Sequence, residues 1–158
     1  LIMNGMPTWA AFISVSIFAP LFEEWLCRGL VLRGLLHKTK PYLAIIASAA
    51  FFALIHGNLW QAIPAFGMGL LFGYVYYKTG SLKLTMLMHF ANNTLAFVLS
   101  TIPSLRDAEY YIDVLSPWAY AGVYLAAVVT IVFGLILLKG IPTKEGDLGG
   151  CRLIKSIF

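Results

Sequence analysis

Three charged side chains, Glu23, Glu24 and Arg28, stand directly after the apolar run of residues 9–21. A charge inside a membrane-spanning helix costs about 2.5 to 3.5 kcal/mol on insertion scales, so such a group usually has a function. At about 100° per residue, Glu24 and Arg28 share one helix face, whereas Glu23 points about 140° away from Arg28. We therefore predict that Glu24 and Arg28 neutralise each other and that Glu23 is available for chemistry. The alternative is that the helix leaves the membrane here and all three charges are hydrated.

Two histidines and an asparagine lie in later apolar runs. His56 follows Phe52 by four positions and Asn93 follows His89 by four, so each pair shares a helix face. At 1.5 Å per residue from the cytoplasmic end of each run, Glu23 and His56 lie about 20 Å deep and Asn93 about 15 Å deep. A carboxylate, two imidazoles and an amide at similar depths suit hydrolysis, which needs a base, a group that orients water and oxyanion donors. Taken singly, a histidine on an apolar helix is more often a hydrogen-bonding partner between helices.

Water is the predicted nucleophile. The sequence contains neither the G-x-S-x-G turn of serine hydrolases nor the H-E-x-x-H helix of zinc proteases. Ser48 and Ser100 have no acidic neighbour in the sequence that would recommend either of them as a nucleophile.

The composition predicts an integral membrane protein. Of the 158 residues 60% are hydrophobic and 11% charged, with a mean hydropathy of +0.84, whereas soluble domains have about a quarter charged residues. The net charge of +4 comes from short basic clusters between apolar runs, so we expect no nucleic-acid partner. Cys27 and Cys151 are too few for a metal or redox motif, and Cys27 is expected to be a small packing residue.

The pattern of apolar runs predicts an all-α fold, a polytopic transmembrane helix bundle with about five spans. We expect residues 1–140 to form one transmembrane domain and residues 141–158 a loose cytoplasmic tail. Pro20 is expected to kink the first helix, and Gly69 and Gly73 form a small-xxx-small packing face in the third. The predicted helices are Thr8 to about Leu36, Tyr42 to His56 after Pro41, Ala62 to Tyr77, Leu84 to about Thr101, and Trp118 to Leu138.

Basic residues are concentrated after the first, third and fifth predicted helices. Because cytoplasmic loops carry an excess of Lys and Arg, this alternation places the amino terminus outside and the tail in the cytoplasm. The basic residues are Arg28, Arg33, Lys38 and Lys40 after the first apolar run (residues 9–21), Lys78 and Lys83 after the third, and Lys139 onwards after the fifth.

Three motifs in this order carry a family resemblance: Glu23-Glu24-x-x-x-Arg28, Phe52-x-x-x-His56 and His89-x-x-x-Asn93. They resemble the motifs of the CAAX protease and bacteriocin-processing (CPBP) family of intramembrane proteases, which includes the type II CAAX prenyl endopeptidases. The resemblance covers about Ala19 to Leu95. It implies that Glu23 and His56 activate water, that His89 and Asn93 form the oxyanion site, and that Glu24 and Arg28 support them.

The resemblance also implies a biological setting. We expect an integral protein of a bacterial plasma membrane that hydrolyses a peptide or protein substrate, either prenylated or of the bacteriocin type. Members of this family usually have more than five helices, so further helices are expected upstream.

The sequence allows alternatives for the cofactor and for the function. The family is often described as metalloproteases, and Glu23, His56 and His89 are acceptable ligands for Zn²⁺. We favour a mechanism without a cofactor, because the two histidines lie on separate helices and Asn93 is a poor zinc ligand but a good oxyanion donor. The rival functions are a non-catalytic bacteriocin-immunity or scaffold protein and, less favoured, a proton-coupled transporter.

Overall fold

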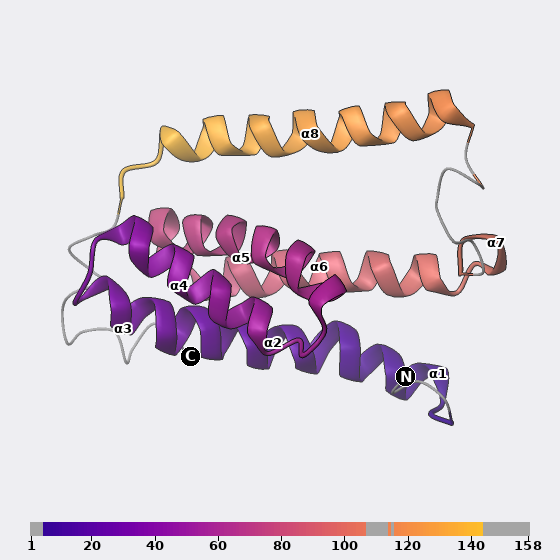
Figure 1. Cartoon of the computed structure of the whole chain (residues 1–158), viewed down its shortest axis with the longest axis horizontal. Coiled ribbons are helices and arrows are strands. Elements are labelled where there is room, and N and C mark those ends of the chain that lie inside the picture. Colours follow the sequence, from indigo (N-terminus) through magenta and orange to yellow (C-terminus); the bar gives the residue numbers. More distant parts are fainter. Residues whose placement is uncertain (1–4, 107–113, 115, 144–158) are drawn as a thin grey trace.

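In the structure, a computed structural model that describes residues 5–106, 114 and 116–143, all the regular secondary structure of these residues is helical (Figure 1). This confirms the all-α prediction. The described residues form five long helices: an N-terminal helix Thr8–Leu36, α4 (Pro41–Leu54), α5 (Leu59–Thr79), α6 (Leu82–Ser100) and α8 (Pro117–Lys139); α7 (Pro103–Arg106) is a single short turn.

The N-terminal helix extends over the predicted residues, but its hydrogen-bond pattern changes along its length. It consists of α1 (Thr8–Phe12), the π-helical η1 (Ile13–Phe18), α2 (Ala19–Glu24), the π-helical η2 (Trp25–Leu32) and α3 (Arg33–Leu36). Pro20, at the start of α2, lacks an amide hydrogen, and its ring would collide with the carbonyl of Ser16 in a regular α-helix. The wider turns of η1 directly before it accommodate the proline without interrupting the helix.

Local capping sets the ends of the next helices. Pro41 begins α4, as predicted. The third predicted helix starts earlier than expected, because the Asn58 side chain accepts a hydrogen bond from the Trp60 amide at 2.9 Å and so begins α5 at Leu59. Gly57 in the connection has φ +63°, a conformation that favours glycine. Since α4 ends at Leu54, His56 lies in the turn beyond this helix, not on its last turn as predicted.

Helices α4 and α5 pack closely through small residues. A Cβ added to Gly69 would lie 2.9 Å from the Cα of Ala49, and one added to Gly73 would lie 3.1 Å from the Cγ2 of Ile45. The predicted small-xxx-small face is therefore confirmed, and α4 is its partner. Cys27 is fully buried beside this pair of helices, which confirms its predicted packing role.

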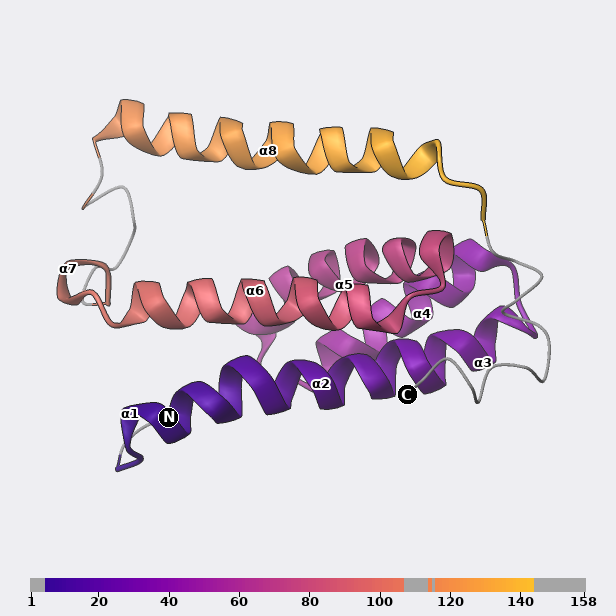
Figure 2. The same cartoon turned by 180° about the vertical axis from the view of Figure 1, so that it is seen from behind.

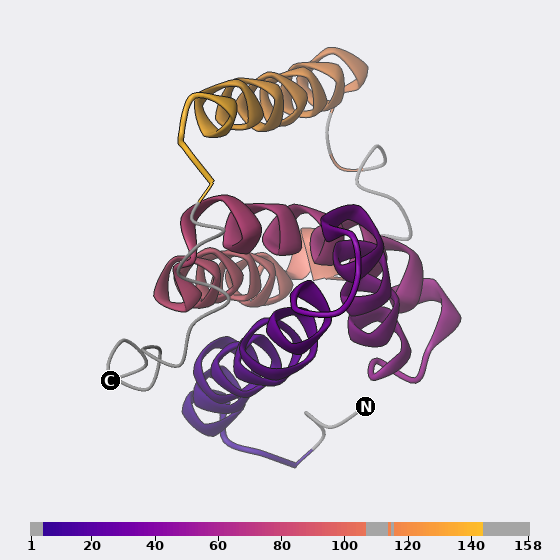
Figure 3. The ribbon, with the colours of Figure 1, turned by 90° about the vertical axis from the view of Figure 1, so that its left-hand side faces the viewer.

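The N-terminal helix, α4, α5 and α6 pack side by side, and the view from behind shows α6 along the N-terminal helix (Figure 2). Phe12 and Phe97 join these two helices edge to face, with ring centroids 5.4 Å apart. Helix α8 lies apart from this four-helix cluster (Figure 3) and has no buried residue. The predicted tail, residues 141–158, lies outside the described residues from residue 144 onwards, as does Cys151.

Two of the described helices are long and apolar enough to cross a membrane. They are Thr8–Leu36, with a mean hydropathy of 1.4, and Pro117–Lys139, with a mean hydropathy of 2.6. Helix α4 is apolar but has only 14 residues. The prediction of about five spans thus corresponds to five long helices in the described residues, of which two are candidate spans by length and composition.

Candidate active site

The Glu24 carboxylate and the Arg28 guanidinium form a buried ion pair on the N-terminal helix. Glu24 Oε1 accepts a hydrogen bond from Arg28 Nη1 at 2.7 Å, and both side chains are 0% exposed. The predicted i,i+4 pairing of these two residues is confirmed. Because a buried charge is costly unless it is paired, this arrangement explains how both residues are tolerated in an apolar setting.

Arg28 is also held by the helices that face it. Its Nη2 donates a hydrogen bond to the backbone carbonyl of Gly69 in α5 at 2.9 Å. Its guanidinium carbon lies 4.6 Å from the ring centroid of Phe52 and 5.4 Å from that of Phe72. These cation–π contacts and the carbonyl bond fix the guanidinium among three helices. Arg28 therefore orients Glu24 as well as neutralising it.

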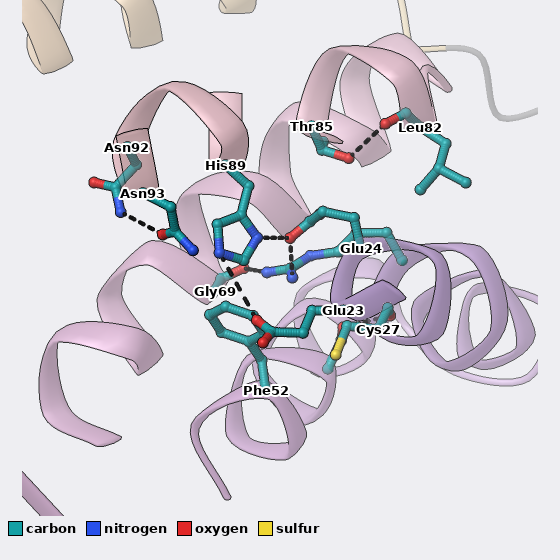
Figure 4. Close-up of polar contacts among 12 residues, drawn as sticks. Glu23, Glu24, Cys27, Phe52, Gly69, Leu82, Thr85, His89, Asn92 and Asn93 are labelled. Carbon is teal, nitrogen blue, oxygen red and sulfur yellow. Dashed lines mark hydrogen bonds and ion pairs between the residues drawn. The ribbon is translucent and has the colours of Figure 1, made fainter. Parts of the chain in front are cut away.

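His89, from α6, lies between the two adjacent glutamates (Figure 4). Its Nδ1 is 3.1 Å from Glu24 Oε1 and its Nε2 is 3.8 Å from Glu23 Oε2. The ring packs against Phe52 and Phe72, with centroids 5.5 and 5.4 Å away. One imidazole thus connects both carboxylates of the first motif, a contact that the sequence did not predict.

Glu23 differs from Glu24 in its exposure. The Glu23 side chain is 22% exposed, whereas that of Glu24 is fully buried. The Phe52 ring contacts both histidines, with its centroid 4.9 Å from that of His56 and 5.5 Å from that of His89, and His89 lies beside Glu23. The structure therefore brings Glu23, His56 and His89 into one region, with Glu23 as the more exposed of the two carboxylates.

His56 has a defined proton position. Its Nδ1 lies 2.8 Å from the backbone carbonyl of Phe52, and since a carbonyl only accepts, Nδ1 carries the hydrogen and donates it. The His56 and Phe52 rings pack edge to face at 4.9 Å, so the expected contact between them is confirmed although His56 lies beyond α4. Nε2 of a neutral His56 is consequently left as an acceptor.

Asn93 binds the N-terminal helix through its amide. Its Nδ2 donates a hydrogen bond to the Val15 carbonyl at 2.9 Å, and its Oδ1 accepts one from Asn92 Nδ2 at 3.3 Å. These two bonds fix the orientation of the amide group. One of the two Nδ2 hydrogens is used for Val15, which leaves the other for a ligand.

The described residues contain no group of three or more His, Cys, Asp and Glu side chains that could hold one metal ion. The alternative zinc ligands Glu23, His56 and His89 therefore do not form such a group in the described structure. Ser48 is buried and its hydroxyl donates a hydrogen bond to the Cys27 carbonyl at 2.8 Å, so this hydroxyl is occupied by a structural bond.

Two parts of this site had weak or no signals in the sequence. Gly69 contributes a backbone carbonyl to Arg28, and only its place in the small-xxx-small face marked it as a position of close approach. Phe72 contacts both Arg28 and His89. Nothing in its local sequence separates it from the other aromatic residues.

Comparison with known proteins finds a match to one protein family and similarity to proteins named as membrane peptidases or proteases. Residues 5–95 match the family model described as type II CAAX prenyl endopeptidase Rce1-like. YdiL of Bacillus subtilis, named as a candidate membrane peptidase, is 26% identical over 88 residues, which cover 56% of this chain and 36% of YdiL. The membrane-embedded CAAX protease MroQ of Staphylococcus aureus is 32% identical over 100 residues, which cover 59% of this chain and 39% of MroQ.

The chain thus spans little more than a third of the length of these two relatives. No solved structure matches it. The family match covers more than half of the 158 residues and contains Glu23, Glu24, Arg28, His56 and His89, together with Asn93. It confirms the resemblance identified from the three motifs, and the chain belongs to the Rce1-like family of type II CAAX prenyl endopeptidases.

Proposed function

We propose that this chain carries the catalytic site of an intramembrane endopeptidase in which Glu23 is the general base. The observation that carries the proposal is the difference in burial and in partners between the two glutamates. Glu24 is buried and paired with Arg28, whereas Glu23 is partly exposed and faces His89 Nε2 at 3.8 Å. A carboxylate that is reachable by water and surrounded by fixed polar groups is what activation of water requires.

The proposed reaction is hydrolysis of a peptide bond by a water molecule. Glu23 takes the proton of this water, and the free Nε2 of His56 accepts its second hydrogen and so orients it. The oxygen attacks the peptide carbonyl, and the second Nδ2 hydrogen of Asn93 stabilises the oxyanion, joined by His89 when its Nε2 is protonated. The C–N bond then breaks, and the proton from water passes to the leaving amine.

The proposed substrate is a peptide or protein at the membrane, prenylated or of the bacteriocin type. Family membership and the name of the relative MroQ support a CAAX-type peptide. In this proposal the five long helices cross the membrane, with the amino terminus outside and the tail in the cytoplasm of a bacterial cell.

A cleavage assay tests this function. The purified protein in liposomes is incubated with a farnesylated CAAX peptide and, separately, with the same peptide lacking the farnesyl group, and products are identified by mass spectrometry. We expect cleavage of the farnesylated peptide that is lost in Glu23→Gln. His37→Gln, which replaces an exposed histidine in the turn before α4, is the control and should retain activity.

The structure also gives a reason to test a non-catalytic immunity or scaffold function. Arg28, His89 and Asn93 each connect two helices through polar contacts, as residues that only hold a helix bundle together would do. The two functions differ in their dependence on Glu23. If the protein is a scaffold or an immunity protein, its Glu23→Gln variant should protect cells as well as the wild type does. If it is the proposed protease, the Glu23→Gln variant should no longer cleave its substrate.

A further inference from the structure

We infer that Glu24 is a positioning residue that keeps the hydrogen of neutral His89 on Nδ1, so that the bare Nε2 faces Glu23. The position of this hydrogen follows from the geometry alone. Its catalytic consequence, that His89 receives a proton from Glu23, rests on the proposed function.

The ion pair with Arg28 fixes the charge of Glu24. Its Oε1 accepts a hydrogen bond from Arg28 Nη1 at 2.7 Å in a fully buried pair, which requires the ionised carboxylate to balance the guanidinium. An ionised carboxylate has only acceptor atoms. His89 Nδ1, 3.1 Å from the same oxygen, must therefore carry the hydrogen and donate it.

The opposite side of the His89 ring carries the lone pair. A neutral imidazole has one N–H, so a hydrogen on Nδ1 leaves Nε2 with a lone pair. This atom is 3.8 Å from Glu23 Oε2, which is longer than a hydrogen bond, and catalytic hydrogen bonds are often long before a substrate binds. The ring is held in place by the Phe52 and Phe72 rings on α4 and α5, so the two nitrogens are not interchangeable.

Residues of the N-terminal helix, α4 and α5 face His89. The N-terminal helix supplies Glu23 and Glu24, with Arg28 bonded to Glu24. Helices α4 and α5 supply the two aromatic rings. Because the two ring nitrogens have different partners, Nδ1 is the donor, bonded to Glu24, and Nε2 is the acceptor, facing Glu23.

In the proposed reaction, this geometry lets His89 first accept a proton from Glu23 and then donate it to the leaving amine. Glu23 Oε2 takes a proton from water as the new C–O bond forms, and then passes it to Nε2 of His89. The resulting imidazolium lies between two carboxylates, and its Nε2–H is donated to the amine nitrogen as the C–N bond breaks. Asn93 is accordingly the donor present at the moment of attack, because neutral His89 has no Nε2–H to offer.

The position of the hydrogen can be measured directly by NMR of protein labelled with ¹⁵N-histidine. The chain has three histidines, and single His→Gln variants assign their signals. The spectrum is recorded at a pH at which the signal of exposed His37 shows that it is neutral. We expect a protonated Nδ1 and a bare Nε2 at His89, with His56 as a reference of the same form because it donates from Nδ1 to a carbonyl.

A bare Nδ1 with a protonated Nε2 at His89, or a ring protonated on both nitrogens, would overturn the inference. The matched variant is Glu24→Leu with Arg28→Met, which removes both charges of the buried pair together and leaves no acceptor at position 24. In this variant the preference for Nδ1–H at His89 should be lost, since neither Leu nor Met offers an oxygen to this hydrogen. An unchanged preference in the folded double variant would show that Glu24 does not position the hydrogen.

Two controls keep this test independent of activity. Glu23→Gln should retain the Nδ1–H form of His89, because it leaves Glu24 and Arg28 in place. If the double variant does not fold, the wild-type spectrum still decides the position of the hydrogen. A wild-type protein with Nδ1–H at His89 but without peptide cleavage would refute the proposed function and leave the positioning role standing.

Discussion

Replacing Glu24 by Gln should destabilise the protein far more than replacing its neighbour Glu23 by Gln. Glu24→Gln leaves the fully buried Arg28 guanidinium without its counter-charge. Removing one partner of a buried ion pair typically costs about 3 to 5 kcal/mol. Arg28 keeps its bond to the Gly69 carbonyl and its aromatic contacts, but neither of these supplies a negative charge.

The same substitution at Glu23 has a different cost. Glu23 is partly exposed, and its Oε2 is 3.8 Å from His89 Nε2. Loss of such a loose, partly hydrated contact costs about 1 kcal/mol or less. Glu23→Gln should therefore fold normally and lose cleavage activity, whereas Glu24→Gln should lose stability first.

Thermal unfolding in detergent measures this difference. A loss of about 3 to 5 kcal/mol in a chain of this size lowers the Tm by about 6 to 20 °C, whereas Glu23→Gln should shift it by only a few degrees. A variant with Glu24→Leu and Arg28→Met removes both charges and should recover much of the lost stability, because apolar replacement of a whole buried pair is often nearly neutral. An unchanged Tm in Glu24→Gln together with a large fall in Glu23→Gln would show that the roles of the two glutamates are reversed.

Three further predictions concern packing, topology and metal. Gly69→Ala should cost about 1 to 3 kcal/mol because its Cβ would meet the Ala49 backbone, whereas Gly67→Ala, with nothing within 4 Å, should gain about 0.5 to 1 kcal/mol; equal unfolding free energies would contradict the packing argument. Single cysteines at Ser81 and Ser104 should label from the cytoplasmic and external sides, respectively, and labelling from one side would remove the assigned topology. Exhaustive treatment with a strong chelator should leave cleavage unchanged; stoichiometric zinc, with activity lost on its removal and restored on its return, would defeat the mechanism without metal.

The helices and their close contacts were largely predictable because their signals are local. Pro41 marks the start of α4, and the i,i+4 spacing of Glu24 and Arg28 predicts their pairing on one helix. Gly69 marks a close approach by its lack of a side chain. Each of these predictions needs only the geometry of one helix and the chemistry of the residues on it.

The start of α5 was missed for a local reason, and the site contacts for a long-range one. Asn58 caps α5 and extends it to Leu59, which hydropathy does not report. The contacts of His89 with Glu24 and of Asn93 with Val15 join residues 65 and 78 positions apart. Their existence depends on how α6 lies against the N-terminal helix, and helical periodicity carries no information on that arrangement.

The packing of α6 against the N-terminal helix explains why Glu23 and Glu24 are consecutive in the sequence. Consecutive helix positions differ by about 100° in direction, so two neighbouring carboxylates approach a facing side chain from different sides. The His89 ring, entering from α6, meets Glu24 with one nitrogen and Glu23 with the other. A spacing of four residues would have placed both carboxylates above one another on one face. The consecutive pair thus lets Glu24 bond the imidazole at Nδ1 and places Glu23 beside Nε2, where the proposed mechanism has the proton exchange take place.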